Sequence, residues 1–149
     1  MDKKSGQAAI WLFLVSFLYI WSARVHRHFG IVFCDRVEYT SAVFDYGRAL
    51  DFNPRFAQAY LERGILLWRE LGEARRAIVD FTVALRLRPG WPEALFFRGL
   101  AHQGASNYSA AIHDLSAYLE SEDMSWRQDA IRQLSLMQLV WGNGSIIQE

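Results

Sequence analysis

The chain begins with a continuous run of apolar residues. Residues 8–23 carry no charge and only two serines, and they follow a short polar tail, residues 1–7. At about 1.5 Å per residue this run forms a helix of about 24 Å, somewhat short of a hydrocarbon core of about 30 Å. Aromatic rings near both ends suit the membrane–water interfaces. The pattern predicts a transmembrane anchor over residues 8–23, and the residues expected to contact lipid are Trp11, Phe13, Leu14, Phe17, Leu18, Tyr19 and Trp21.

A signal peptide and a buried core helix fit the apolar run less well. A cleaved signal peptide needs small residues at positions −3 and −1 of its cleavage site, and Trp21 and Ala23 do not supply that pair. A buried core helix that is apolar on every face needs a larger protein around it than this chain offers. One alternative stays open, in which the apolar helix packs on the rest of the chain and the protein is soluble or peripheral.

Basic residues flank the predicted anchor on both sides. Lys3 and Lys4 precede it, and Arg24, Arg27 and Arg36 follow it. Because the side with more Lys and Arg stays in the cytoplasm, the sequence predicts a single-pass membrane protein whose C-terminal domain is cytoplasmic. Since neither Pro nor Gly stands at the junction between Ala23, the end of the apolar run, and Arg24, we expect one continuous helix from about residue 8 to about residue 37.

After the apolar run, small and large residues recur at intervals of 34 or 35. The positions that repeat are Gly30, Gly64 and Gly99; Ala42, Ala77 and Ala111; Tyr46, Phe81 and Leu115; and Pro54 and Pro89. Self-similarity at this period indicates a helical repeat array, in which each unit buries its apolar face against its neighbours. Two prolines indicate helix starts, one at Asn53-Pro54 and one at Trp91-Pro92.

These residues resemble the tetratricopeptide repeat (TPR) family, whose helix-turn-helix units are about 34 residues long. The middle unit matches best, with Tyr60, Gly64, Leu67, Ala77, Phe81, Ala84 and Pro89 at the family's positions. The resemblance implies an all-α fold, a right-handed helical-repeat array of about three units. The units are placed at residues 23–56, 57–90 and 91–124, which gives an array over residues 23–124.

A further apolar stripe follows the third unit. It consists of Trp126, Ala130, Ile131, Leu134, Met137 and Val140/Trp141. The segment lacks the glycine of the repeat, so residues 125–141 are predicted to form a capping helix over the end of the array. Residues 142–149 are expected to be a tail.

In TPR proteins the first helix of each unit lines an inner groove, and the resemblance places an apolar set of residues there. The predicted partner groove is formed by Leu61, Ile65, Trp68, Phe96, Phe97 and Leu100. Such a surface suits an apolar or amphipathic segment of a protein partner. The alternative is that the C-terminal stripe or the anchor fills the groove. Relatives that grip chaperone carboxylates use a Lys/Asn clamp at the groove positions, and neither residue type occurs at those positions here.

The net charge and the pattern of reactive residues argue against several classes of function. Sixteen Lys+Arg balance sixteen Asp+Glu, which argues against nucleic-acid binding. The balance is uneven, because residues 24–98 hold twelve arginines against nine acids and residues 99–149 hold two against six. One cysteine and four separated histidines form no metal or nucleophile motif. We therefore predict no catalytic, cofactor-binding or metal-binding residues and no enzyme. The predicted function is protein–protein interaction, as an accessory subunit or assembly factor of a membrane protein complex.

Overall fold

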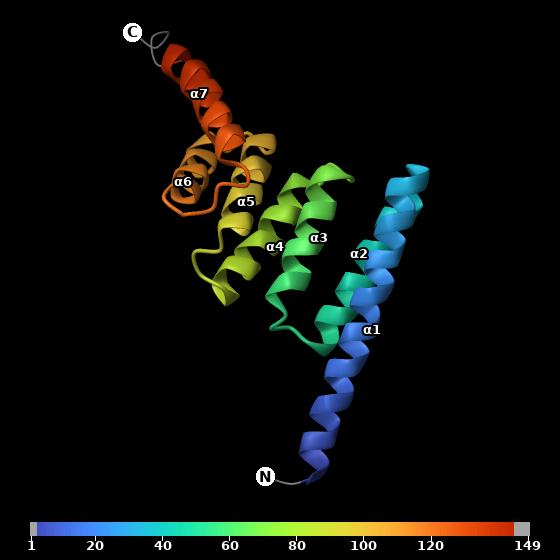
Figure 1. Cartoon of the computed structure of the whole chain (residues 1–149). Coiled ribbons are helices and arrows are strands. Elements are labelled where there is room, and N and C mark those ends of the chain that lie inside the picture. The colour runs from blue at the N-terminus through green and yellow to red at the C-terminus, as the bar shows by residue number, and fades with distance from the viewer. Residues whose placement is uncertain (1–2, 145–149) are drawn as a thin grey trace.

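Residues 3–144 of the computed structural model form seven α-helices and no strands, and side chains are described for residues 6–139. The helices are α1 Lys3–Phe33, α2 Arg36–Phe52, α3 Ala57–Arg69, α4 Ala74–Leu87, α5 Pro92–Gly104, α6 Tyr108–Leu119 and α7 Arg127–Gly144. Helices α1 to α6 pack as three antiparallel pairs, which stack on one another in chain order (Figure 1). The predicted all-α repeat architecture is confirmed.

The first helix is continuous across Ala23 and Arg24 and longer than any other helix in the described residues. It begins at Lys3, inside the predicted N-terminal tail, and its N-terminal end extends past the other helices (Figure 1). It ends at Phe33, about four residues earlier than predicted, because Cys34 adopts a left-handed φ of 53°. Asp35 then caps α2 by accepting a hydrogen bond from the Val37 backbone N–H.

The apolar run and the first repeat overlap within α1. Ser16 donates from its hydroxyl to the Ala49 carbonyl at 2.9 Å, and Ile20 and Ala23 are buried. Ser22 donates to the Asp45 carboxylate at 2.5 Å. Helix α2 therefore packs along α1 from Ser16 onward. The predicted boundary at residue 23 falls inside this packed segment, because the antiparallel pairing of α2 needs a partner of similar length.

The repeated small and large residues meet inside the units. The alanines at 42, 77 and 111 have no exposed surface, and neither do Tyr46, Phe81 and Leu115. A Cβ built on Gly64 would lie 2.6 Å from the Phe81 ring, and one on Gly99 would lie 2.8 Å from Leu115. Such distances are too short for carbon atoms, so only glycine allows this approach of the two helices.

The two proline signals have different outcomes. Pro92 is the first residue of α5, as predicted. The prediction at Asn53-Pro54 is wrong, because α3 begins only at Ala57 and the proline lies in the turn before it.

A buried ion pair joins the two helices of the second unit, and an equivalent pair joins those of the third. Arg63 donates to both carboxylate oxygens of Asp80 at 2.7 Å, and Arg98 does the same to Asp114. The first unit has Asp45 at the equivalent position, but Phe29 stands where the arginine would be. Ser22 donates to Asp45 instead, and the His26 Nε2 atom lies 3.7 Å from the same carboxylate. The two-point geometry of the Arg–Asp pairs favours one alignment of the helices in the second and third units.

Helix α7 lies at the opposite end of the array from α1 (Figure 1). Ala130 and Met137 are buried and Leu134 is partly buried, whereas Ile131 is exposed, contrary to its expected place in the capping stripe. The helix continues to Gly144, beyond the predicted end at residue 141. The side chains of Val140 and Trp141, the start of the chain (residues 1–2) and most of the predicted C-terminal tail (145–149) lie outside the described residues.

Candidate functional site

The first helices of the three units lie next to one another and provide the inner layer of the array. Arg24 on α1 reaches Glu62 on α3, and Trp68 on α3 contacts Phe97 on α5 with ring centroids 5.9 Å apart. The six residues of the predicted partner groove all lie on α3 and α5. Whether they form an open surface depends on how far each is exposed.

The structure separates these six residues into two groups. Leu61, Phe96 and Phe97 are buried, with 0%, 3% and 7% of their surface exposed. Ile65, Trp68 and Leu100 are only partly buried and pack against the core from outside. The buried three therefore belong to the core, and the second group is the part of the predicted groove that another molecule can reach.

The Trp126 ring packs on both phenylalanines. It stacks on Phe96 at 5.2 Å and meets Phe97 edge-on at 5.3 Å. The Tyr118 ring also packs on Phe96, and its hydroxyl accepts a hydrogen bond from the Trp126 backbone N–H at 2.8 Å. Of the two interpretations left open by the sequence, filling by the C-terminal segment describes this part of the inner layer.

A polar network crosses from α1 to α3 beside the apolar residues. The Glu62 carboxylate accepts hydrogen bonds from Arg24 at 3.0 Å, from the Tyr46 hydroxyl at 2.7 Å and from Gln58 at 3.1 Å. Burial alone would raise the pKa of Glu62, but these three donors together lower it. Burial and the Glu62 carboxylate raise the pKa of Tyr46. The network therefore holds Glu62 ionised and ties α1 to α3.

A second acid stands on the first turn of α5. Burial raises the pKa of Glu93, and the nearby carboxylates of Glu62 and Asp123 raise it further. The inner layer thus has carboxyl groups on α3 and α5, opposite Arg24 and Arg27 on α1. An acidic peptide would meet repulsion from Glu62 at this place and would have to displace the bond between Glu62 and Arg24.

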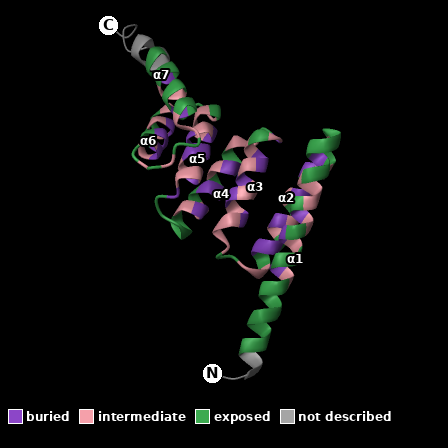
Figure 2. Cartoon of the chain, in the orientation of Figure 1, coloured by how far each residue is buried: buried purple, intermediate pink, exposed green. Residues whose placement is uncertain are grey.

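The predicted anchor residues lie on the protruding part of α1 and on its outward side. Residues 6–14 are exposed on all faces (Figure 2). Trp11 is 68% exposed, Leu18 63% and Trp21 63%, and Phe13, Leu14 and Phe17 are also exposed. Tyr19 differs, because its ring stacks on Phe52 of α2 at 5.8 Å. In the described residues, α1 is the helix whose length and apolar composition allow it to cross a membrane.

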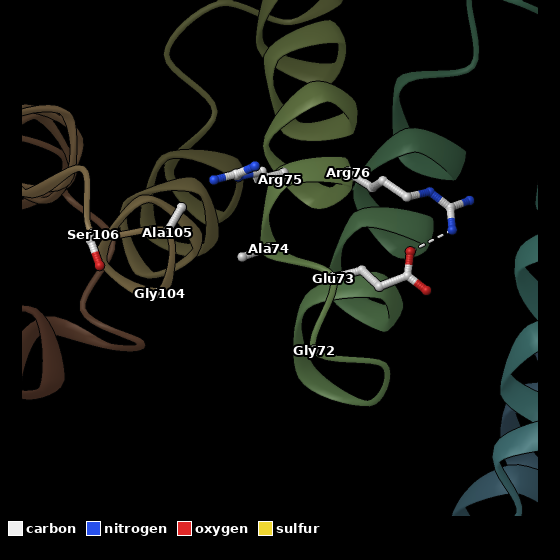
Figure 3. A pocket seen from close by; sticks show the side chains of 8 residues that line it. All are labelled: Gly72, Glu73, Ala74, Arg75, Arg76, Gly104, Ala105 and Ser106. Atoms are coloured by element: carbon white, nitrogen blue, oxygen red, sulfur yellow. Dashed lines mark hydrogen bonds and ion pairs between the residues drawn. The ribbon is translucent and has the colours of Figure 1, made fainter.

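A shallow pocket of about 540 Å³ lies at the α3–α4 and α5–α6 turns (Figure 3). Arg75 extends along it, while Arg76 turns away and pairs with Glu73 (Figure 3). The other lining residues are Gly72, Ala74, Gly104, Ala105 and Ser106. Small side chains beside a guanidinium supply no acid–base pair or activated nucleophile. Among the described residues no group of three or more His, Cys, Asp or Glu is placed to hold a metal ion.

The polar contacts between helices were not predicted from the sequence. A signal for the ion pairs was present, since Arg63 and Arg98 each precede a repeat glycine, and Asp80 and Asp114 each precede the large residue that packs on it. The Glu62 network had no such signal, because its donors come from three different helices.

The fold defines a helical-repeat protein of the TPR type. A scan against protein-family models finds no match. Among solved structures, the chain is similar to the TPR domain of Arabidopsis OM64, with a TM-score of 0.71 and 21% identity over 83% of this chain and 97% of that one. It is also similar to the first TPR domain of Spaghetti (RPAP3) bound to the HSP90 peptide SRMEEVD, with a TM-score of 0.68 and 21% identity over 83% and 95%. A third is the TPR domain of Sgt2 from Aspergillus fumigatus, with a TM-score of 0.68 and 20% identity over 85% and 83%.

Proposed function

We propose that the chain is a membrane-attached TPR protein that binds a protein partner, as an accessory subunit or assembly factor of a membrane protein complex. The observation that carries this proposal is the exposed apolar end of α1, which continues without a linker into the first repeat. Exposed apolar surface of this extent is costly in water and favourable in lipid. A partner in the same membrane would then meet the array at high effective concentration.

The partner surface that we propose is the accessible part of the inner layer. Ile65, Trp68 and Leu100 keep exposed apolar surface, and the Arg24–Glu62 network provides polar groups beside them. TPR domains similar to this one bind peptides, as in the Spaghetti complex with an HSP90 peptide. The ionised Glu62 favours an apolar or amphipathic segment here over an acidic tail. We propose no catalytic role, and a cytoplasmic location for the array.

A second candidate function is a peripheral or soluble adaptor whose apolar helix is part of the array. The specific observation in its favour is the packing of α1 on α2 from Ser16 onward, including the buried Ile20 and Ala23. In that case the exposed residues 6–14 would be covered by something other than lipid.

The partner surface is tested by replacing Ile65 and Trp68 with alanine in the full-length, tagged chain. We expect a specific partner to be lost from gentle detergent extracts, because removing central apolar anchors costs about 2 kcal/mol or more of binding free energy. The matched control replaces Val37 and Val79, exposed residues on α2 and α4, with alanine and should keep the partner. Retention of the partner by an Ile65/Trp68 variant of normal helix content would contradict the proposed surface.

A further inference from the structure

The protruding end of α1 is too short to hold the array away from a bilayer. From Lys3 to Tyr19 the helix rises about 24 Å, less than a hydrocarbon core of about 30 Å. At Tyr19 the helix is already in contact with Phe52, the last residue of α2. A membrane that takes up the exposed apolar residues therefore meets the α2–α3 turn, which follows Phe52 directly.

The antiparallel arrangement of the helices places a second turn on the same side. The α2–α3 and α4–α5 turns lie at the side of the array from which α1 protrudes, and the α1–α2, α3–α4 and α5–α6 turns lie at the opposite side (Figure 1). The first of these sides faces the bilayer when the protruding end is inserted.

Arginines collect at the membrane side of the first two units. Arg55 lies in the α2–α3 turn, Arg86 in the last turn of α4 and Arg88 in the α4–α5 turn, and all three are exposed. Among the side chains of residues 6–139, no carboxylate forms an ion pair with any of these three guanidinium groups. Arg88 instead lies over the Trp91 ring at 4.6 Å. Within residues 6–139, Arg55 and Arg86 thus have no carboxylate partner, and Arg88 attracts the Glu93 carboxylate only from beyond ion-pair distance.

On the opposite side, by contrast, most arginines have polar partners. Arg69 pairs with Glu70 at 3.3 Å, Arg76 pairs with Glu73, and Arg36 donates to the Leu71 carbonyl at 3.2 Å. Arg75, beside the shallow pocket, is the exception within the described residues. Arg55, Arg86 and Arg88 therefore all lack an ion-pair partner among residues 6–139, whereas two of these four arginines on the opposite side have one.

We propose that Arg55, Arg86 and Arg88 bind the headgroups of anionic phospholipids, so that the α2–α3 and α4–α5 turns rest on the membrane surface. This inference relies on the membrane attachment proposed above. Guanidinium groups suit phosphate because they donate two parallel hydrogen bonds, and each basic residue close to an anionic bilayer adds to its attraction. The array then has a fixed orientation, with its α1–α2 turn directed away from the lipid.

The test places a spin label on the membrane side of the full-length chain in phosphatidylcholine vesicles with or without phosphatidylglycerol. The label is attached to Pro89→Cys in a Cys34→Ser background, and in a second sample to the native Cys34, which is exposed in the α1–α2 turn. With phosphatidylglycerol we expect the spin label at position 89 to become less accessible to a water-soluble paramagnetic relaxation agent. We expect the label at Cys34 to stay accessible to that agent in both lipids.

Variants separate the proposed contact from general attraction. One triple variant combines Arg55→Gln, Arg86→Gln and Arg88→Gln, and it should restore access of the relaxation agent to position 89. A control triple variant combines Arg69→Gln, Arg75→Gln and Arg76→Gln. It removes as many charges on the opposite side and should not restore that access. Equal accessibility of position 89 in both lipids would overturn the headgroup contact and leave membrane attachment standing. So would an accessibility in the first triple variant that equals that of the unsubstituted chain. Failure of the wild-type chain to float with either kind of vesicle would overturn membrane attachment, and the contact with it.

Discussion

Replacing Phe13 and Leu14 with aspartate is expected to release the chain from membranes. Each aspartate at the centre of an apolar helix costs about 2.5–3.5 kcal/mol of insertion free energy, so the pair weakens insertion by roughly a thousandfold or more. Both side chains are exposed, at 59% and 46%, and lie before the segment of α1 that packs on α2. The fold should therefore persist while membrane association is lost, as measured by sedimentation of membranes and by circular dichroism of the released chain.

The matched control places aspartate at Val37 and Val79. These residues are similarly exposed, at 67% and 63%, but lie on α2 and α4. We expect this variant to stay with the membrane fraction. If the Phe13/Leu14 variant remained membrane-bound to the same extent as the control, the protruding end of α1 would not be the attachment.

The second large effect is expected at Asp114. Its carboxylate is 2% exposed and accepts two hydrogen bonds from Arg98, whose side chain is 19% exposed. Asp114→Ala leaves that guanidinium partly buried without a counter-charge, which costs roughly 3 kcal/mol of unfolding free energy. The measurement is urea unfolding of the full-length chain in mild detergent, followed by helix signal.

Asp51→Ala is the control for Asp114. Asp51 is 66% exposed and pairs with Arg48 at 3.4 Å on the surface, so its loss should cost well under about 1 kcal/mol. Asp80→Ala should resemble Asp114→Ala, because Asp80 has the same place and the same partner geometry in the second unit. Equal unfolding free energies for the Asp114 and Asp51 variants would contradict the assigned role of the buried pairs.

The fold was predictable because its close contacts need particular residue sizes. Gly64 and Gly99 face Phe81 and Leu115 where no Cβ fits. The recurrence of the glycine and of its large partner every 34 or 35 residues reflects that requirement. The helix start at Ala57 was not predictable from Pro54 alone. A proline after asparagine suits a turn as well as a first helical turn.

The overlap of the apolar run with the first repeat was missed, although the sequence contained a signal. Ser16 and Ser22 are the polar residues of the run, and both donate to α2, at the Ala49 carbonyl and the Asp45 carboxylate. Polar side chains within an apolar helix indicate the face that packs on protein. With α2 extending over 17 residues, an antiparallel partner must reach back to about Phe17.

The candidate groove was less predictable than the fold. Positions on α3 and α5 follow from the repeat, but the burial of Phe96 and Phe97 depends on where the Trp126 ring lies. That position depends on the turn after α6 and on the bond between Tyr118 and the Trp126 backbone. Such tertiary contacts leave no periodic trace in the sequence.

Carbonate extraction of membranes that contain the full-length chain tests the central claim most directly, namely that the exposed apolar end of α1 attaches a rigid repeat array to the bilayer. The structure predicts that the chain stays in the membrane pellet and enters solution only with detergent, because residues 6–14 find no cover within the described part of the array. Release by carbonate, as a chain that is monodisperse without detergent, would contradict the claim.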